Sequence, residues 1–189
     1  MIATRFRFLD RFRIAGDDPL FDVCLALTLE GEGQLIEQEG ILLGEEVQVR
    51  GQAWGIRSIA EAAFAAPDNH PMNGYFDTML SNNMAWFLDT YGPGKSGPLF
   101  SPMGALISQY NNNQTPSYES DFFATVMSWL TENNVPNASA VLNSVGRMQI
   151  DRFLAQSSGF CTSKAAGYWL QTKNASGAYI NSWSEFYSR

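Results

Sequence analysis

The chain has 189 residues, 45 % hydrophobic and 13 % aromatic, enough for one packed domain with a sizeable core. Nineteen acidic residues against twelve basic ones give a net charge of −7, which argues against nucleic-acid binding. No apolar run reaches the roughly 18 to 20 residues that cross a bilayer, so we expect no membrane association. No export signal is visible, and the localisation is left open.

Metal-ligating residues are scarce. There is a single histidine, His70, and Cys24 and Cys161 lie far apart in the sequence. One histidine and two cysteines that are distant in sequence do not match the ligand spacing of a zinc site, so we expect no metal and no other cofactor. Because free cysteine packs as a small hydrophobic residue, both thiols are expected to be buried.

Residues 1–48 are expected to form an irregular N-terminal segment. Arginine and phenylalanine alternate between Arg5 and Arg13, a pattern typical of a half-buried strand or of a flexible terminus. Asp18 and Pro19 then predict a short helix over about Pro19–Leu29, since they suit the cap and the first helical position. Glycines interrupt residues 31–44, where we expect a loop with one helical turn.

Residues 49–189 are expected to form a domain of antiparallel helical hairpins, which makes the fold class all-α. Apolar residues at helical spacing predict a first helix from Val49 to Phe64 and a second from Pro71 to about Tyr91. Only Pro67 to His70 connect the two helices, and so short a link places the second helix antiparallel to the first.

The second half of this region predicts further short helices. Met103–Tyr110 can form a helical turn or two, and a longer helix opens at Ser117 or Ser120. Another helix should begin after Pro136 with Asn137 as its cap, and Gly146 with Arg147 suggests a break within it. Lys164–Leu170 is expected to be a final short helix or strand.

Two groups of polar and aromatic residues are candidate ligand contacts. Arg50, Trp54, Arg57 and Glu61 are spaced to lie in one stripe of the first helix, although a solvated face with one Arg57–Glu61 ion pair would give the same pattern. On the second helix, Asn82 and its neighbour Asn83 are poor helix formers that need a partner, either another helix or a ligand, and Trp86 comes after them.

The run Val49–Phe64, followed by Pro67-Asp68 and Pro71, resembles a segment of large bacterial and phage-associated proteins of unassigned activity. Tyr118–Phe123, Gly146-Arg147-Met148 and Gly159-Phe160-Cys161 resemble later segments of those proteins, in the same order. Those regions are in turn similar to the (α/α) toroid, or six-hairpin, architecture of glycoside hydrolases and polysaccharide lyases. The resemblance implies part of such a toroid, because the chain supplies fewer helices than a complete one.

Carbohydrate chemistry would need particular residues. Hydrolysis uses two carboxylates, about 5 Å apart for retention or about 6.5 to 9.5 Å for inversion. Glu61, Asp68, Glu119 and Asp121 are the eligible acids, although acids in a first helical turn also complement the helix dipole. A lyase would instead need a cation or amide, from Arg50, Arg57 or Asn82, and a base such as Tyr118 or His70.

The leading hypothesis is carbohydrate recognition or processing, with a polysaccharide or glycan as the partner. Its candidate catalytic residues are Glu119, Asp121 and Tyr118, and its candidate substrate-binding residues are Arg50, Trp54, Arg57, Asn82 and Trp86. The alternative is a non-catalytic structural or protein-interaction module, virion-associated or part of a larger protein. A partial toroid would also expose hairpin faces, which predicts a homo-oligomer or a partner that supplies the missing half.

Overall fold

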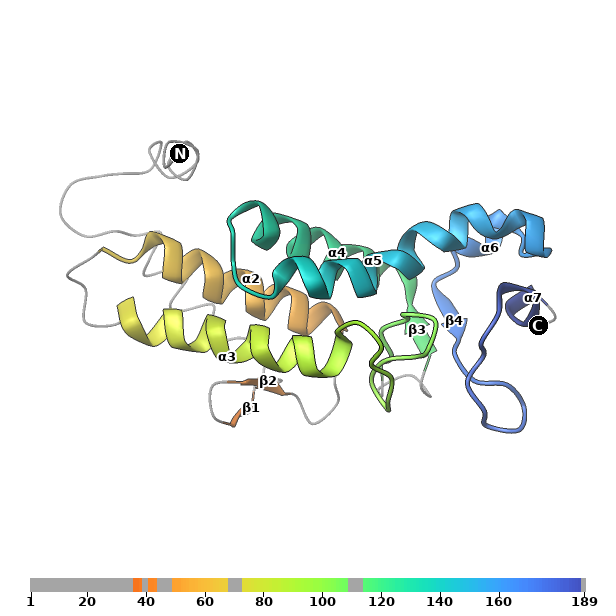
Figure 1. Ribbon diagram of the computed structural model, residues 1–189, viewed down its shortest axis with the longest axis horizontal. Coiled ribbons are helices and arrows are strands. Elements are labelled where there is room, and N and C mark those ends of the chain that lie inside the picture. Colours follow the sequence, from red (N-terminus) through yellow and green to blue (C-terminus); the bar gives the residue numbers. More distant parts are fainter. Residues whose placement is uncertain (1–35, 39–40, 44–48, 68–72, 109–113, 188–189) are drawn as a thin grey trace.

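The computed structural model describes residues 36–38, 41–43, 49–67, 73–108 and 114–187 (Figure 1). Within them the chain is mostly helical, which confirms the all-α class. The elements are β1 Ile36–Gln38, β2 Ile41–Leu43, α2 Val49–Ala65, α3 Asn73–Tyr91, β3 Gln114–Pro116, α4 Ser117–Glu132, α5 Ala138–Leu154, a 3-10 helix Ala155–Ser158, α6 Thr162–Ala165, β4 Trp169–Gln171 and α7 Trp183–Tyr187.

The four long helices pack side by side as an up-down-up-down bundle (Figure 1). α2 contacts α3 and α4, and α5 contacts the same two helices. The Tyr91 hydroxyl donates to the Gln52 side chain at 2.9 Å, so the end of α3 lies beside the start of α2 and the expected antiparallel hairpin is confirmed. α4 and α5 form a second antiparallel hairpin. The starts of α2 and α4 and the end of α5 therefore meet at one end of the bundle.

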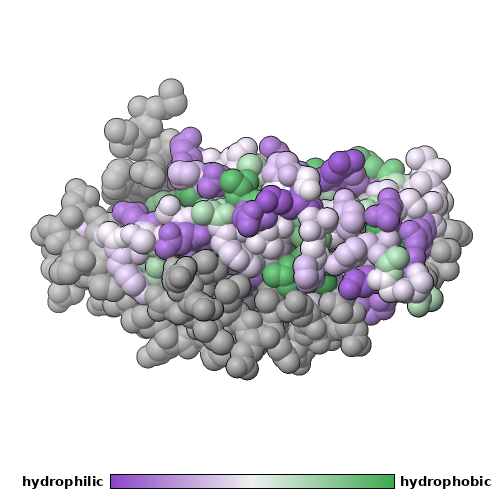
Figure 2. Space-filling view, turned by 60° about the horizontal axis from the view of Figure 1, so that its bottom comes forward, coloured by the Kyte–Doolittle hydropathy of each residue, from purple (hydrophilic) through white to green (hydrophobic). Residues whose placement is uncertain are grey.

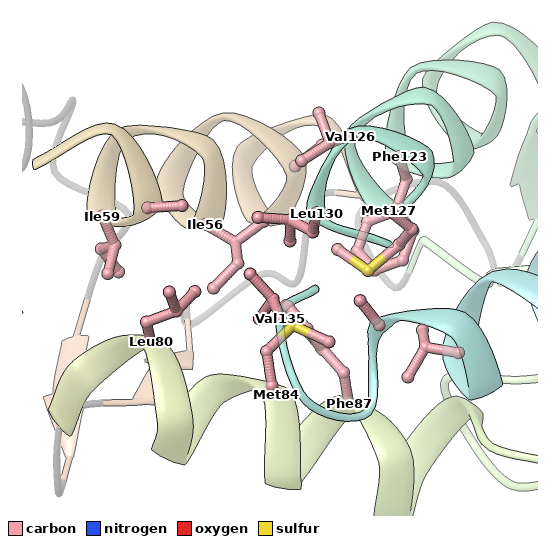
Figure 3. Close-up of a cluster of buried hydrophobic side chains, with 14 of the residues drawn as sticks. Ile56, Ile59, Leu80, Met84, Phe87, Phe123, Val126, Met127, Leu130 and Val135 are labelled. Carbon is pink, nitrogen blue, oxygen red and sulfur yellow. The ribbon is translucent and has the colours of Figure 1, made fainter. Parts of the chain in front are cut away.

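The main hydrophobic core lies between these helices. Figure 3 shows Ile56 of α2, Leu80 of α3 and Leu130 of α4 pointing into it, and all three are buried. The helical spacing of apolar residues that predicted α2 and α4 is the spacing of these inward faces. The predicted helix over Val49–Phe64 is confirmed, and α3 ends at Tyr91 as expected.

A second, smaller core lies beyond that end of the bundle, where the last segments of the chain gather (Figure 1). Ala105, Met148, Phe160, Leu170 and Phe186 are among its buried members. β4 pairs antiparallel with β3, with Leu170 opposite Thr115. This pairing brings the chain after α6 back to the start of α4.

The molecular surface is mixed in character. In the view of Figure 2, hydrophilic residues are interspersed with small hydrophobic patches. No helix among the described residues is long and apolar enough to span a membrane.

Two predictions for the loops are wrong. Where residues 31–44 are described, at 36–38 and 41–43, they form neither a loop nor a helical turn but the antiparallel pair β1–β2, with Ile36 opposite Leu43; branched apolar residues favour strands. Met103–Tyr110 is not helical over its described part, because Gly104 has a positive φ of 85° and Leu106 bridges to Phe100 in extended conformation. The strand and helix predicted before residue 30 lie outside the described residues.

Details of α5 and of the last segment also differ from expectation. Asn137 precedes α5 but makes no side-chain cap, because its backbone is left-handed with φ 69°. α5 runs through Gly146 without a break, since a glycine in a packed helix only lowers its propensity. Lys164–Leu170 is neither one helix nor one strand: it spans the end of α6 and the start of β4.

Candidate functional site

Most of the large exposed hydrophobic residues near the start of α4 are aromatic. We call Trp54, Phe122, Tyr118 and Tyr168 the aromatic cluster. Tyr118 and Phe122 are four residues apart on α4, so they share one face of the helix. Trp54 of α2 packs edge-on against Phe122 with ring centroids 6.1 Å apart, and Tyr168 stacks on Tyr118.

The two tyrosines form a fixed pair although they are fifty residues apart in sequence. Their ring centroids lie 4.9 Å apart with an interplanar angle of 30°, and their hydroxyl oxygens lie 3.0 Å apart. The pairing of β3 with β4 explains this proximity, and the Ser117 hydroxyl donates to the Gly167 carbonyl just before Tyr168. Tyr118 is 37 % exposed and Tyr168 63 %, so the pair remains open to solvent.

Glu119 contacts Tyr118 of this pair and is only 3 % exposed. One carboxylate oxygen accepts the Tyr118 hydroxyl at 2.7 Å, and the other accepts the backbone N–H of Arg50 at 3.2 Å. Arg50 is in the first turn of α2, whose N–H groups have no partner within their own helix. Glu119 therefore caps a neighbouring helix, and its charge complements the dipole there.

Asp121 contacts α5, whereas Glu119 contacts α2. A single nitrogen of Arg152, Nη2, lies 2.6 and 2.5 Å from its two carboxylate oxygens. The other terminal nitrogen donates to the Ser117 carbonyl at 3.3 Å and to the Gln149 side chain at 2.5 Å. Arg152 thus ties the first turn of α4 to the end of α5.

The remaining α2 candidates line the same helix face as Trp54. Trp54 is 48 % exposed, and the Arg50 guanidinium carbon lies 5.1 Å from the centre of its ring. Arg57 and Glu61 form the expected ion pair at 2.8 Å. Because Arg57 is exposed, this pair contributes little to stability. An ordinary solvated ion pair therefore explains the positions of Arg57 and Glu61, and no ligand is needed to account for them.

The candidates on α3 lie elsewhere in the bundle. Trp86 is half-buried against Phe87 and Tyr91 and belongs to the edge of the main core. Asn82 is exposed on the same helix, whereas its buried neighbour Asn83 donates to the Met79 carbonyl at 2.8 Å. Asp68 and His70 lie outside the described residues.

The partners of the candidate catalytic residues determine the chemistry open to them. Two residues that are two positions apart on a helix do not face each other, and Glu119 indeed contacts α2 whereas Asp121 contacts α5. The Tyr118 hydroxyl donates its one hydrogen to the Glu119 carboxylate, and this bond favours the neutral form of the phenol. The phenol therefore stays protonated at neutral pH and is suited to hydrogen bonding rather than to proton abstraction.

Sequence reasoning missed Arg152 as a member of the site, and it did not connect Tyr168 to Tyr118. A signal for Arg152 was present: it continues the spacing of the buried residues Val141, Val145 and Met148, so it lies on the inward face of α5. An arginine on that face needs an acidic partner. Nothing local indicates the Tyr118–Tyr168 contact, because it depends on strand pairing between distant segments.

Among the residues that the structure describes, no group of three histidine, cysteine or acidic side chains could hold a metal ion. Comparison of the chain with protein families, curated proteins and solved structures gives no match. The geometry of the aromatic cluster is therefore the main guide to function.

Proposed function

We propose that this protein recognises carbohydrate through the aromatic cluster, and that its helical hairpins correspond to part of an (α/α) toroid. The observation that supports this proposal best is the Tyr118–Tyr168 pair, which is exposed, stacked and anchored to the buried Glu119. Trp54 extends the aromatic surface along α2.

A fixed aromatic surface suits a sugar ring. The C–H face of a pyranose packs on the flat face of tyrosine or tryptophan, while its hydroxyls reach polar groups at the ring edges. The tyrosines are held by stacking and by two hydrogen bonds in series, so little side-chain freedom is lost on binding.

The positions of the acids support recognition more than hydrolysis. A hydrolase needs two carboxyl groups that flank one bond. Glu119 and Asp121 instead point to different helices, and each accepts hydrogen bonds from the protein. We therefore place catalysis second and give both acids a positioning role.

The distribution of charge is compatible with an uncharged ligand. Residues 49–189 contain eight basic and nine acidic residues, so this region is close to neutral. The net negative charge comes from residues 17–48, which contain nine acidic residues and no basic one. The region that carries the aromatic cluster therefore has no strong field to repel or attract a glycan.

The test is calorimetric titration of the full chain with hexasaccharides of different sugars. Tyr168→Ala and Trp54→Ala are expected to weaken binding by about tenfold or more, as is typical of interface aromatic residues. Glu132→Ala, an exposed change at the far end of α4, serves as the control and should bind as the wild type does. A folded wild-type protein that binds none of the hexasaccharides would contradict the proposal.

The same samples test for processing. Reducing ends and the ultraviolet absorbance of unsaturated products are followed after incubation with neutral and acidic polysaccharides. Product that is absent with Glu119→Gln and with Asp121→Asn, each shown by circular dichroism to be folded, would establish a catalytic role for these acids. Binding without product is the result that we expect.

A second candidate function, self-association, rests on a different surface. Ile150, Phe153 and Leu154 are exposed on one face of α5 near its end, at the spacing of a helix-packing stripe. The near-neutral charge of residues 49–189 allows a second copy to approach this face. Sedimentation of the wild type and of Leu154→Glu tests this self-association. A dimeric wild type and a monomeric variant would support it, and a monomeric wild type would exclude it.

A further inference from the structure

The hydrogen bonds in the aromatic cluster have a defined direction. The Tyr118 hydroxyl donates to Glu119, whose carboxylate can only accept. A phenol has one hydrogen, so Tyr118 has none left for Tyr168. The contact of 3.0 Å between the two hydroxyls therefore requires that Tyr168 donates and Tyr118 accepts.

This direction determines what Tyr168 offers to a ligand. Its single hydrogen is directed at Tyr118, so its oxygen presents only lone pairs to the solvent. The negative charge of Glu119 polarises the chain of hydrogen bonds and strengthens the outer oxygen as an acceptor. A ligand at this position must therefore bring a hydrogen-bond donor.

Charged residues near the two tyrosines also bear on the choice of ligand: Asp121 offers hydrogen-bond acceptors, and Arg50 carries a positive charge beside Trp54. Asp121 lies three residues after Tyr118 on α4, and its side chain is 47 % exposed. The rings of Tyr118 and Tyr168 present π-faces, which attract cations. Among the described residues at the cluster, Arg50 is the cation on the Trp54 side, where its guanidinium lies over the indole. Arg152 is buried behind Asp121.

We infer that the ligand of this surface is an amino sugar, whose ammonium group donates to the Tyr168 oxygen while a sugar face packs on the aromatic rings. This inference rests on the proposed carbohydrate recognition and specifies its substrate class. Neutral sugars bind more weakly, because a hydroxyl donates without a charge. Uronates are disfavoured at Tyr168, since a carboxylate meets only lone pairs there.

One substitution is expected to reverse the direction of the hydrogen bonds. In Glu119→Gln the amide oxygen must face the Arg50 N–H, which needs an acceptor. The amide nitrogen then faces the Tyr118 oxygen and donates to it. Tyr118 turns its hydrogen to Tyr168, which in turn points its own hydrogen outward. The variant should therefore lose the preference for a cationic sugar.

The experiment measures binding of three hexasaccharides, of glucosamine, glucose and glucuronate, at pH 5, where the glucosamine amines are protonated and the glucuronate carboxylates are ionised. We expect the wild type to bind the glucosamine hexamer at least tenfold more tightly than the glucuronate hexamer. In Glu119→Gln that ratio should fall about tenfold. Glu132→Gln removes an exposed charge elsewhere on α4 and should leave the ratio unchanged.

The outcomes are distinguishable. If none of the hexamers binds, the proposed function itself fails. If all bind equally, or if the glucuronate hexamer binds best, carbohydrate recognition stands and the amino-sugar assignment is overturned. A pentalysine peptide that binds as tightly as the glucosamine hexamer would show that the ammonium group alone is recognised, and it would overturn the sugar assignment as well. Circular dichroism of each variant verifies that it is folded.

Discussion

The buried guanidinium of Arg152 neutralises a carboxylate, that of Asp121, which itself remains 47 % exposed. The two partners therefore differ in what they lose when separated. Asp121 can regain water, whereas Arg152 is 3 % exposed and its Nε already lacks a partner among the described residues. The ion pair therefore mainly offsets the free-energy cost of burying the Arg152 cation.

Asp121→Asn is accordingly expected to lower the free energy of unfolding by about 3 kcal/mol, because it leaves a buried cation uncompensated. Adding Arg152→Met to that variant removes the buried charge as well. The double variant should therefore be less destabilised than the sum of the single variants by about 1 to 3 kcal/mol. Urea unfolding of the four proteins measures this coupling.

The matched control is the Arg147–Asp151 pair on α5, which is 3.3 Å apart and largely exposed. The same cycle with Arg147→Met and Asp151→Asn should give a coupling of only about 0.3 kcal/mol. Equal couplings for the two pairs would show that burial does not determine the strength of the Asp121–Arg152 pair.

Local sequence patterns predicted the helices because each long helix has a regular apolar face. Ile56 and Ile59 of α2, like Val126 and Leu130 of α4, repeat at helical spacing and are buried together. The same reasoning failed for Met103–Tyr110, where buried apolar residues lie in an extended segment. There the left-handed backbone at Gly104 interrupts any helix, and the bridge to Phe100 fixes the chain.

The candidate site was predicted only in part. Tyr118, Glu119 and Trp54 do lie together, since each is near the start of a helix and the two helices are neighbours. The partners that decide their chemistry, Tyr168 and Arg152, come from the segment beside β4 and from α5. Pairing between segments that are distant in sequence leaves no local pattern, so the opposite orientations of Glu119 and Asp121 became evident only from the packing.

The turn at Gly104 predicts a difference between two glycines. Both Gly104 and Gly94 have positive φ, 85° and 74°, where a Cβ costs about 1 kcal/mol. A Cβ at Gly104 would also lie 2.9 Å from the Ser144 carbonyl oxygen, whereas one at Gly94 would meet nothing within 4 Å. Gly104→Ala should therefore destabilise the protein by about 2 kcal/mol more than Gly94→Ala in urea unfolding. Equal effects would mean that the loop moves away from α5 at little cost.

Tyr91 predicts a loss of stability in alkali. Burial raises the pKa of its phenol above the ordinary value of 10.0, and the hydrogen bond with Gln52 only partly opposes this. Below pH 10 the phenol is neutral in the folded and unfolded states, so its contribution to stability is fully present. Above pH 10 the unfolded state loses the proton first, and the free energy of unfolding falls.

Urea unfolding between pH 8 and pH 11 checks this behaviour. Tyr91→Phe should show a shallower decline above pH 10 than the wild type, although it is less stable at pH 8 because Gln52 loses its partner. Parallel curves for the two proteins would contradict the assignment of the alkaline decline to Tyr91.

Cys161 corrects a sequence prediction and gives a last test. Its thiol was expected to be buried but is exposed, with its sulfur 3.0 Å from the Ser163 hydroxyl. Hydrogen bonds from the side chain and backbone of Ser163 lower the pKa of the thiol below its ordinary value of 9.0, and Lys164 adds to this effect. The thiolate is the reactive form, so alkylation should be fast for a protein thiol near neutral pH.

The measurement is the rate of alkylation by iodoacetamide as a function of pH, made in Cys24→Ser so that Cys161 alone reacts. The midpoint of the rate profile is expected below pH 9.0. Ser163→Ala removes the hydroxyl hydrogen bond and should move the midpoint upward, while Ser176→Ala, which alters an exposed serine in another turn, should leave it in place. If Ser163→Ala has no effect, the hydroxyl does not stabilise the thiolate, and the lowered pKa depends on the backbone and Lys164 instead.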